Sequence, residues 1–372
     1  MKKKQQKDPK DMKRGYTTGA NATAATKAAL LSLMLQQEVK EVKIPLPIGE
    51  VIPFQMEKVT FSTERAEASV IKDAGDDPDA THQAKIVASV TWRGEPGITI
   101  DGGVGVGRVT KPGLPVPVGE AAINPVPRKM IREAAESVLA ESETQKGIQI
   151  TISVPDGEEI AEKTLNARLG IIGGISILGT RGIVVPFSTA AYKASVVQAI
   201  KVAKESGCDH LFLTTGGRSE KYAMALYEGH QEEAFIEMGD FVGFALKQCK
   251  AQKITKVTLV GMMGKFSKVA QGIMMVHSKS APVDFNFLAD LAKEVGAEEG
   301  LLEEIRSANT ASQVGTMMQE NGYDDFFAKL CIAASRSGLA EVGGGLEIET
   351  ILMTMKQEVL GRETVTCESL SK

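Results

Sequence analysis

The fold of the first half of the chain depends on the stretch Ile98-Thr-Ile-Asp101-Gly-Gly103-Val-Gly105-Val-Gly107-Arg108-Val-Thr-Lys111-Pro112-Gly113. An apolar strand leads into glycines at every second position, and valines stand between them. Such alternation favours a strand, and the pair Pro112-Gly113 stops any helix that begins before it. The stretch therefore predicts a glycine-rich strand or hairpin that leads into a proline-rich segment.

The same letters, Asp-x-Gly-x-Gly-x-Gly after a strand, also match the turn by which many Rossmann-type methyltransferases hold S-adenosylmethionine. In that turn the glycines let the backbone approach the ligand, and a helix follows directly. The valines and Pro112 predict no such helix here. Contact between residues 103–107 and a methyl donor is therefore the less favoured interpretation.

Composition places the chain among ordinary globular proteins. Its 372 residues are enough for two domains, with 43% hydrophobic and 24% charged residues. A net charge of -4 argues against a nucleic-acid surface, and no apolar segment has membrane-spanning length. Cysteines without paired spacing indicate reduced thiols and a cytoplasmic protein; they are Cys208, Cys249, Cys331 and Cys367. The four histidines have no metal-ligand spacing, so no protein-bound metal is predicted.

The pattern of elements changes along the chain. Residues 1–14 are rich in lysine and predict a disordered basic tail. Residues 15–186 contain short alternating segments with few helices, which predicts a sandwich-like α+β domain. Over residues 187–372 strands and helices alternate, which predicts a Rossmann-like, doubly wound α/β domain. Among the expected helices, one covers residues 21–37 and another covers residues 347–360.

An acidic loop, Lys72-Asp73-Ala-Gly75-Asp76-Asp77-Pro78-Asp79-Ala-Thr81-His82, holds four carboxylates and an imidazole. These groups could hold a hard cation, bind a cationic group or supply a general base. The order of residues does not fit a calcium-binding loop, and the glycine and proline are also typical of a solvated turn. We interpret Asp77 and His82 as the best candidates for proton transfer.

Two other segments of the first half could face an anion. Thr17-Thr18-Gly19 precedes an alanine-rich helix, where the residues form either a simple cap or an anion site with free amides. The proline-rich segment 111–128 could present Lys111 and Arg128 to an anion, or could cover a sheet edge.

In the second half, three strand ends lead into turns: Thr214-Thr-Gly-Gly-Arg-Ser-Glu220, Met238-Gly-Asp240 and Gly261-Met-Met-Gly-Lys265. Carboxyl ends of parallel strands form the ligand crevice of a doubly wound sheet. The last turn is not a Walker A loop, because Leu259 stands where glycine is needed and Phe266 where Ser or Thr is needed.

In their order along the chain, these motifs resemble those of the cobalt-precorrin-5B C(1)-methyltransferase family (CbiD) of anaerobic cobalamin biosynthesis. The resemblance runs from Arg14-Gly-Tyr-Thr-Thr-Gly19 to about Leu360. Its most specific pieces are residues 72–82, 109–119, 123–127, 174–182 and 214–220. One departure is Asn21, where many relatives have cysteine, so the resemblance implies no role for a thiol there.

The resemblance implies methyl transfer from S-adenosylmethionine to C1 of a contracted tetrapyrrole, with cobalt carried by the substrate. We expect the donor in the second domain, at Thr215, Gly216, Gly217, Arg218, Asp240, Gly261 and Gly264. We expect the tetrapyrrole at the first domain, on Thr17, Thr18, Asp73, Asp76, Gly103, Gly105, Lys111 and Arg128, with Asp77 and His82 as acid or base.

Two other classes of function stay open from the residues alone. A nucleotide-dependent kinase or ligase would place phosphate on residues 103–107 and magnesium on the acidic loop. A non-catalytic carrier would bind the tetrapyrrole without consuming a donor. The sequence leaves open whether the chain forms homo-oligomers or contacts other enzymes of the pathway.

Overall fold

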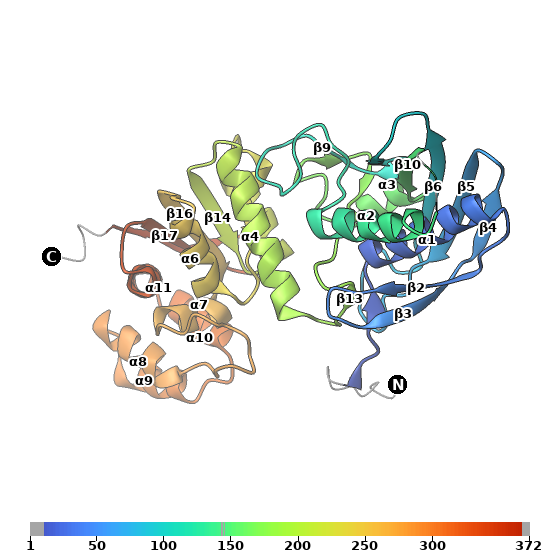
Figure 1. Cartoon of the computed structure of the whole chain (residues 1–372). Helices are drawn as coiled ribbons and strands as arrows, with labels where there is room; N and C mark the ends of the chain where they lie inside the picture. The colour runs from blue at the N-terminus through green and yellow to red at the C-terminus, as the bar shows by residue number, and fades with distance from the viewer. Residues whose placement is uncertain (1–10, 143, 145, 367–372) are drawn as a thin grey trace. The chain divides into compact units, whose positions relative to one another are not determined.

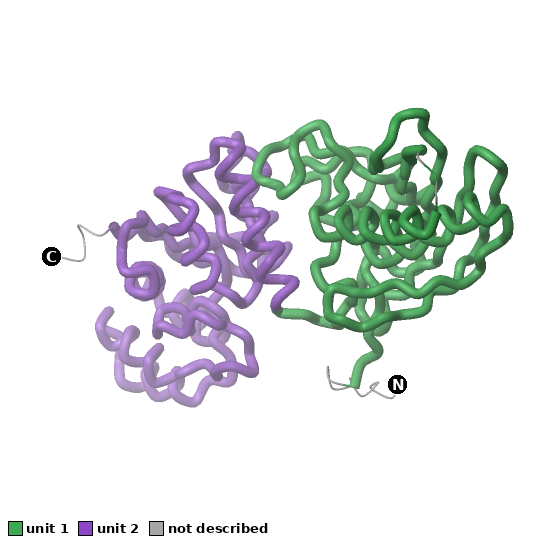
Figure 2. Tube along the Cα trace, in the orientation of Figure 1, with its two compact units in different colours: residues 1–189 green, residues 190–372 purple. Residues whose placement is uncertain are grey.

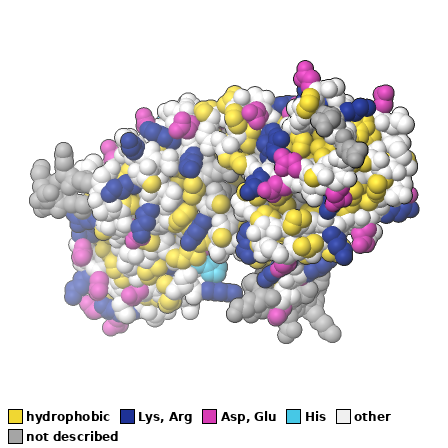
Figure 3. Space-filling model, viewed as in Figure 1, with side chains coloured by type: hydrophobic (Ala, Val, Ile, Leu, Met, Phe, Trp, Pro, Cys, Tyr) yellow, Lys and Arg dark blue, Asp and Glu magenta, His cyan; other side chains and the backbone are white. Residues whose placement is uncertain are grey.

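The structure is a computed structural model that describes residues 11–142, 144 and 146–366. The chain forms two compact units, Met1–Thr189 and Ala190–Lys372 (Figure 2). Each unit has its own hydrophobic core. On the face in Figure 3, basic and acidic side chains are interspersed, with apolar side chains between them. No helix among the described residues has both the length and the apolar character to cross a bilayer.

The predicted basic tail lies only partly within the described residues. Residues 1–10 are outside them. Lys13 and Arg14 pair with the acidic loop: the Lys13 amide donates to Asp76, and Arg14 forms a β-bridge with Gly75. The prediction of a disordered tail is therefore wrong at these two residues.

Unit 1 is built on a five-stranded sheet with helices α1 (Thr18–Leu35) and α2 (Pro125–Leu139) packed against each other (Figure 1). The strand order is β4 (Lys58–Phe61), β5 (Arg65–Ile71), β6 (Lys85–Arg93), β10 (Gly147–Ser153) and β7 (Ile98–Gly102). Only the β10–β7 pair is parallel. Helix α1 contacts β5 and β6, and its buried alanines allow that close approach. Unit 1 is thus an α+β structure, as predicted.

Shorter elements complete unit 1. Strand β1 (Gly15–Tyr16) pairs with β13 (Ile183–Val184), β2 (Glu41–Pro45) with β3 (Val51–Gln55), and α3 (Gly157–Ala161) follows β10.

The glycine-rich stretch forms β7, β8 (Gly105–Val106) and β9 (Arg108–Val109), which confirms the prediction of strands without a helix. Strand β8 pairs with β12 (Gly174–Ile175), and β9 pairs with β11 (Ile171–Ile172). Gly105 has a φ of +68°, and a Cβ at this position would lie 1.8 Å from the Val154 carbonyl oxygen. Close packing of the chain on itself therefore explains this glycine.

Unit 2 contains a second five-stranded sheet, ordered β15 (Phe235–Glu237), β14 (His210–Thr214), β16 (Lys256–Met262), β17 (Glu347–Met353) and β18 (Val359–Val365). The first four strands are parallel, and β18 is antiparallel. From β14 the chain moves to β15 on one side and then to β16 on the other. The direction of strand addition therefore reverses between β14 and β16.

Along the chain, the helices of unit 2 precede or connect these strands (Figure 1). They are α4 (Thr189–Glu205), α5 (Gly217–Leu226), α6 (Val242–Ala251), α7 (Met263–Ala270), α8 (Phe285–Glu294), α9 (Glu299–Arg306), α10 (Ala311–Glu320) and α11 (Asp325–Val342). A short 3-10 helix, η2 (Glu232–Ala234), precedes β15.

The helix predicted over residues 347–360 is wrong, because this segment forms β17 and part of β18. Strand β17 is interior and mostly buried. The alternation of polar and apolar residues at its start does not continue over residues 350–353, so periodicity cannot separate the strand from a buried helix. In the sheet, Glu349 accepts hydrogen bonds from Thr258 Oγ1 and Arg362 Nε, both at 2.6 Å. These long-range partners stabilise the strand.

Candidate functional site

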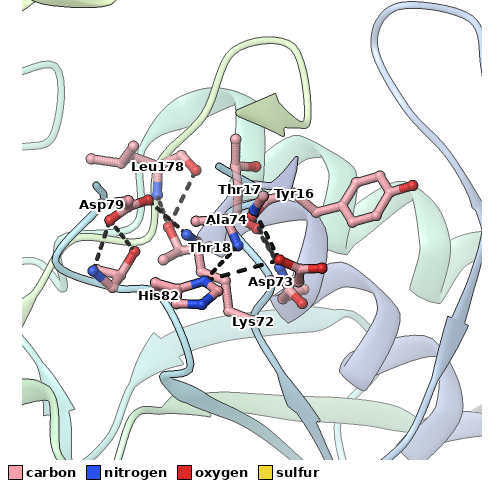
Figure 4. Close-up of polar contacts among 12 residues, drawn as sticks. Tyr16, Thr17, Thr18, Lys72, Asp73, Ala74, Asp79, His82 and Leu178 are labelled. Carbon is pink, nitrogen blue, oxygen red and sulfur yellow. Dashed lines mark hydrogen bonds and ion pairs between the residues drawn. The ribbon is translucent and has the colours of Figure 1, made fainter. Parts of the chain in front are cut away.

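The acidic loop of unit 1 is organised around a buried ion pair (Figure 4). The Lys72 side chain is 1% exposed, and its Nζ lies 2.7 Å from Asp79 Oδ2. The other oxygen of Asp79 accepts hydrogen bonds from the amide and hydroxyl of Thr81. Burial alone would raise the pKa of Asp79, but Lys72 and Thr81 outweigh burial and lower it. Asp79 is therefore a stable carboxylate that neutralises Lys72.

Asp73 and Asp76, predicted to contact substrate, are held by Lys13. Asp73 Oδ2 lies 2.5 Å from Lys13 Nζ, and Asp76 Oδ2 accepts the Lys13 amide at 2.9 Å. The hydrogen bond from Lys13 lowers the pKa of Asp73. Among the described residues, no group of three or more His, Cys, Asp or Glu is arranged to hold a metal ion.

Asp77 and His82, the predicted proton-transfer residues, have different partners. His82 Nδ1 accepts the Ala74 amide at 3.1 Å, and Asp77 Oδ1 accepts the Phe187 amide at 2.9 Å. The catalytic role of both residues stays a prediction.

Thr17 and Thr18 are buried at the start of α1, at 6% and 3% exposure. Thr17 Oγ1 caps the helix by accepting the Ala20 amide, and Thr18 Oγ1 accepts the Leu178 amide at 2.9 Å. The Gly19 amide donates to the Leu178 carbonyl. These contacts contradict an anion site built on free amides there, whereas substrate contact by the two threonines stays a prediction.

Arg128, a predicted substrate residue, covers the edge of the sheet. Its Nη1 donates to the Ile100 carbonyl at 3.1 Å, and Arg132, one helical turn later, donates to the Ile98 carbonyl at 3.2 Å. Both carbonyls belong to the edge strand β7. Of the two interpretations of the proline-rich segment, these contacts support edge covering for Arg128.

The remaining predicted residues of unit 1 lie close to other backbone. The Gly103 amide donates to the Ile152 carbonyl at 2.8 Å, and a Cβ on Gly170 would lie 2.5 Å from the Lys111 side chain. With Gly105 packed on Val154, residues 103–107 serve strand pairing. The phosphate site of the nucleotide-dependent alternative therefore gains no support.

In unit 2, Lys265 joins the three predicted strand ends. Its Nζ lies 3.0 Å from the Thr215 carbonyl after β14 and 3.0 Å from Asp240 Oδ1 after β15. Lys265 itself follows β16, near the start of α7. The structure thus brings together turns that are about 50 residues apart in sequence. We call Thr215, Gly216, Gly217, Asp240, Gly264 and Lys265 the strand-end cluster.

The glycines of this region divide into two kinds. A Cβ on Gly216, Gly217 or Gly264 would meet no atom within 4 Å. A Cβ on Gly261 would lie 2.1 Å from Phe266 Cε2, so side-chain packing explains that glycine. Three of the four glycines therefore leave open space next to the backbone, where a ligand could approach.

Three residues near the predicted crevice were not predicted from the sequence. Tyr192 donates to the Glu237 carbonyl at 3.2 Å; burial, with nearby carboxylates, raises its pKa. Tyr222 donates to the Met355 carbonyl at 2.9 Å, and Arg218 Nη1 lies 3.0 Å from Met355 Sδ. No local motif marks the two tyrosines. The turn that carries Met355 was not predicted, because a helix was predicted over residues 347–360.

The comparisons with known proteins agree with one another. A family model described as CbiD matches residues 5–186, and one for the CbiD C-terminal domain matches residues 275–364. A cobalt-precorrin-5B C(1)-methyltransferase from Priestia megaterium is 65% identical over 96% of this chain and 97% of its own. The chain belongs to the CbiD family. The enzyme of the same name from Geobacillus kaustophilus is 64% identical over 95% of each chain.

As a member of the CbiD family with such relatives, the chain is a C-methyltransferase. A methyltransferase requires a methyl donor. A crystal structure titled cobalamin biosynthesis protein (cbiD), from Archaeoglobus fulgidus, is 26% identical and covers 84% of this chain and 85% of its own, with a TM-score of 0.37.

Proposed function

We propose that the chain methylates C1 of cobalt-precorrin-5B with S-adenosylmethionine, giving cobalt-precorrin-6A in anaerobic cobalamin biosynthesis. The observation that carries this proposal is identity of 63–65% over 95–96% of the chain to three relatives named cobalt-precorrin-5B C(1)-methyltransferase. The proposal keeps the expectation of a cytoplasmic enzyme that acts on a small-molecule tetrapyrrole. Cobalt enters as part of the substrate.

We assign the methyl donor to unit 2, which we interpret as Rossmann-like. Support comes from the reversal of strand order between β14 and β16, since open α/β sheets bind ligands at such a point. The strand-end cluster fits the donor because it combines open backbone at its glycines with one acidic and one basic side chain. S-adenosylmethionine supplies an electrophilic methyl group and offers a carboxylate and ribose hydroxyls for recognition. Thr215, Gly216, Gly217, Arg218, Asp240, Gly261 and Gly264 remain the proposed donor residues.

We assign the tetrapyrrole to unit 1. Its many carboxylates call for cations, and Lys111 and Arg128 are the proposed partners, because guanidinium and ammonium groups bind carboxylates through charge-assisted hydrogen bonds. Arg128 would give up part of its contact with Ile100 to do so. Asp77 and His82 remain the two proposed candidates for proton transfer, and the other proposed contacts are Thr17, Thr18, Asp73, Asp76, Gly103 and Gly105.

The proposal is tested by anaerobic incubation of the protein with cobalt-precorrin-5B and methyl-labelled S-adenosylmethionine. We expect the tetrapyrrole to gain the mass of one labelled methyl group, as read by mass spectrometry. A folded protein that binds both ligands and transfers no methyl group would instead be a carrier. Magnesium-dependent ATP turnover would identify the kinase or ligase alternative.

A further inference from the structure

Lys265 stands where three strand ends of unit 2 meet. Its ammonium group bridges the Thr215 carbonyl and Asp240 Oδ1, at 3.0 Å from each. The side chain is 37% exposed, and that of Asp240 is 23% exposed. The ion pair is therefore positioned by the fold and is still open to a ligand from solvent.

Three glycines next to Thr215 and Lys265 have open space at the position of a Cβ. Gly216 and Gly217 follow Thr215 directly, and Gly264 precedes Lys265. None of these three glycines has an atom within 4 Å of the position of a Cβ. Open space therefore lies beside the backbone that follows Thr215 and precedes Lys265.

Arg218, the other cation at these strand ends, points elsewhere. Its guanidinium lies 3.0 Å from Met355 Sδ, in the turn between β17 and β18. Tyr222 holds the same turn through the Met355 carbonyl. Lys265 instead contacts the residues that follow β14 and β15.

We propose that Lys265 binds the carboxylate at the amino-acid end of S-adenosylmethionine, and that Asp240 binds the ribose hydroxyls. The inference rests on the proposed function. An ammonium group favours a carboxylate partner, and an acidic residue after the second strand of a doubly wound sheet is suited to ribose hydroxyls. The Lys265–Asp240 pair is then the ligand-free arrangement, in which each charge neutralises the other until the ligand provides a partner for both.

Two ligands that differ only at the amino-acid end test this assignment on the full-length protein. S-adenosylhomocysteine has the carboxylate, whereas 5′-methylthioadenosine lacks the whole amino-acid portion. Measured by calorimetry, Lys265→Gln should reduce the affinity for S-adenosylhomocysteine roughly 10- to 100-fold and change the affinity for 5′-methylthioadenosine by no more than about twofold. Lys265→Arg should retain most of the affinity for S-adenosylhomocysteine. Asp240→Asn should weaken the binding of both ligands.

Lys329→Gln is the matched control. Lys329 Nζ lies 2.8 Å from Glu294, its side chain is 41% exposed, and the pair joins α11 to α8. This variant should bind both ligands like the unchanged protein. Thermal unfolding followed by circular dichroism verifies that each variant is folded.

The outcomes separate the inference from the proposed function. If Lys265→Gln lost the same affinity for both ligands, or lost affinity for neither, the carboxylate assignment would be overturned and the donor proposal would stand. If the unchanged protein bound neither ligand, the donor proposal itself would fail, and the role of Lys265 with it.

Discussion

At the scale of single residues, the buried pair of Lys72 and Asp79 makes the acidic loop part of the fold. Asp79→Ala would leave a 1%-exposed ammonium group without its partner, and we expect a loss of about 3–5 kcal/mol of unfolding free energy. Urea denaturation measures this loss. Glu38→Ala, which removes the exposed partner of Lys40, should cost at most about 1 kcal/mol.

The double variant Lys72→Met with Asp79→Ala removes the buried charge as well, and should recover much of the lost stability. If Asp79→Ala alone unfolded no more easily than Glu38→Ala, the loop would not depend on this pair.

His210 predicts a pH dependence of stability. Burial, together with the nearby Lys256 charge, lowers its pKa to about 4. In the unfolded chain a histidine has a pKa of about 6.5, so between these values the unfolded state binds more protons. The contribution of neutral His210 is therefore complete above about pH 6.5 and is lost as the pH falls toward 4. Urea denaturation at several pH values in this range measures the free energy of unfolding. That free energy should change less steeply with pH in His210→Gln than in the unchanged protein, and NMR titration should find the lowered pKa of His210 directly.

At the scale of elements, the glycine-rich segments around Gly105 and Gly217 differ in whether they have room for a side chain. Gly105→Ala forces a side chain into the Val154 carbonyl at a φ of +68°, and should cost about 2–4 kcal/mol of unfolding free energy. Gly217→Val faces open space at the start of α5, and should keep stability within about 1 kcal/mol while weakening donor binding. Thermal unfolding and calorimetry with S-adenosylhomocysteine measure both effects. The reverse pattern, with donor binding lost in a stable Gly105→Ala protein, would move the donor to unit 1.

Sequence reasoning worked for elements whose local signals agree with their surroundings. The predicted helix over residues 21–37 overlaps most of α1, where an alanine-rich run follows a threonine cap. It failed at β17, where partners such as Arg362 and Thr258 are supplied by distant strands. The strand-end cluster could be predicted because parallel strands share one carboxyl edge. The bridge from Lys265 to Asp240 could not, since it depends on side-chain conformations.

At the scale of the whole molecule, the donor proposal predicts where hydrogen exchange slows. A saturating ligand that binds only the folded state stabilises it, by about 2.7 kcal/mol at 100 times its dissociation constant. With S-adenosylhomocysteine we expect protection concentrated at residues 214–220, 238–243 and 261–266. Mass-spectrometric exchange on the full chain, with and without ligand, resolves these peptides. Protection confined to residues 103–107 would contradict the assignment.

The activity was accessible from the sequence because it rests on several long motifs in one order over nearly the whole chain. The assignment of the two ligands to the two units stays a prediction. The segments 14–19, 72–82 and 174–182 converge through backbone contacts, such as Tyr16 with Asp73 and Gly19 with Leu178. A motif that serves folding looks the same in sequence as one that binds a ligand.

The two arginines along strand β7 also affect how readily chains could associate through this sheet edge. An unpaired strand edge is a template on which another chain can add a strand. Arg128 and Arg132 occupy the Ile98 and Ile100 carbonyls that such an incoming strand would need. A residue proposed for ligand recognition thus also occupies, with or without substrate, a hydrogen-bonding position at which another chain could add a strand.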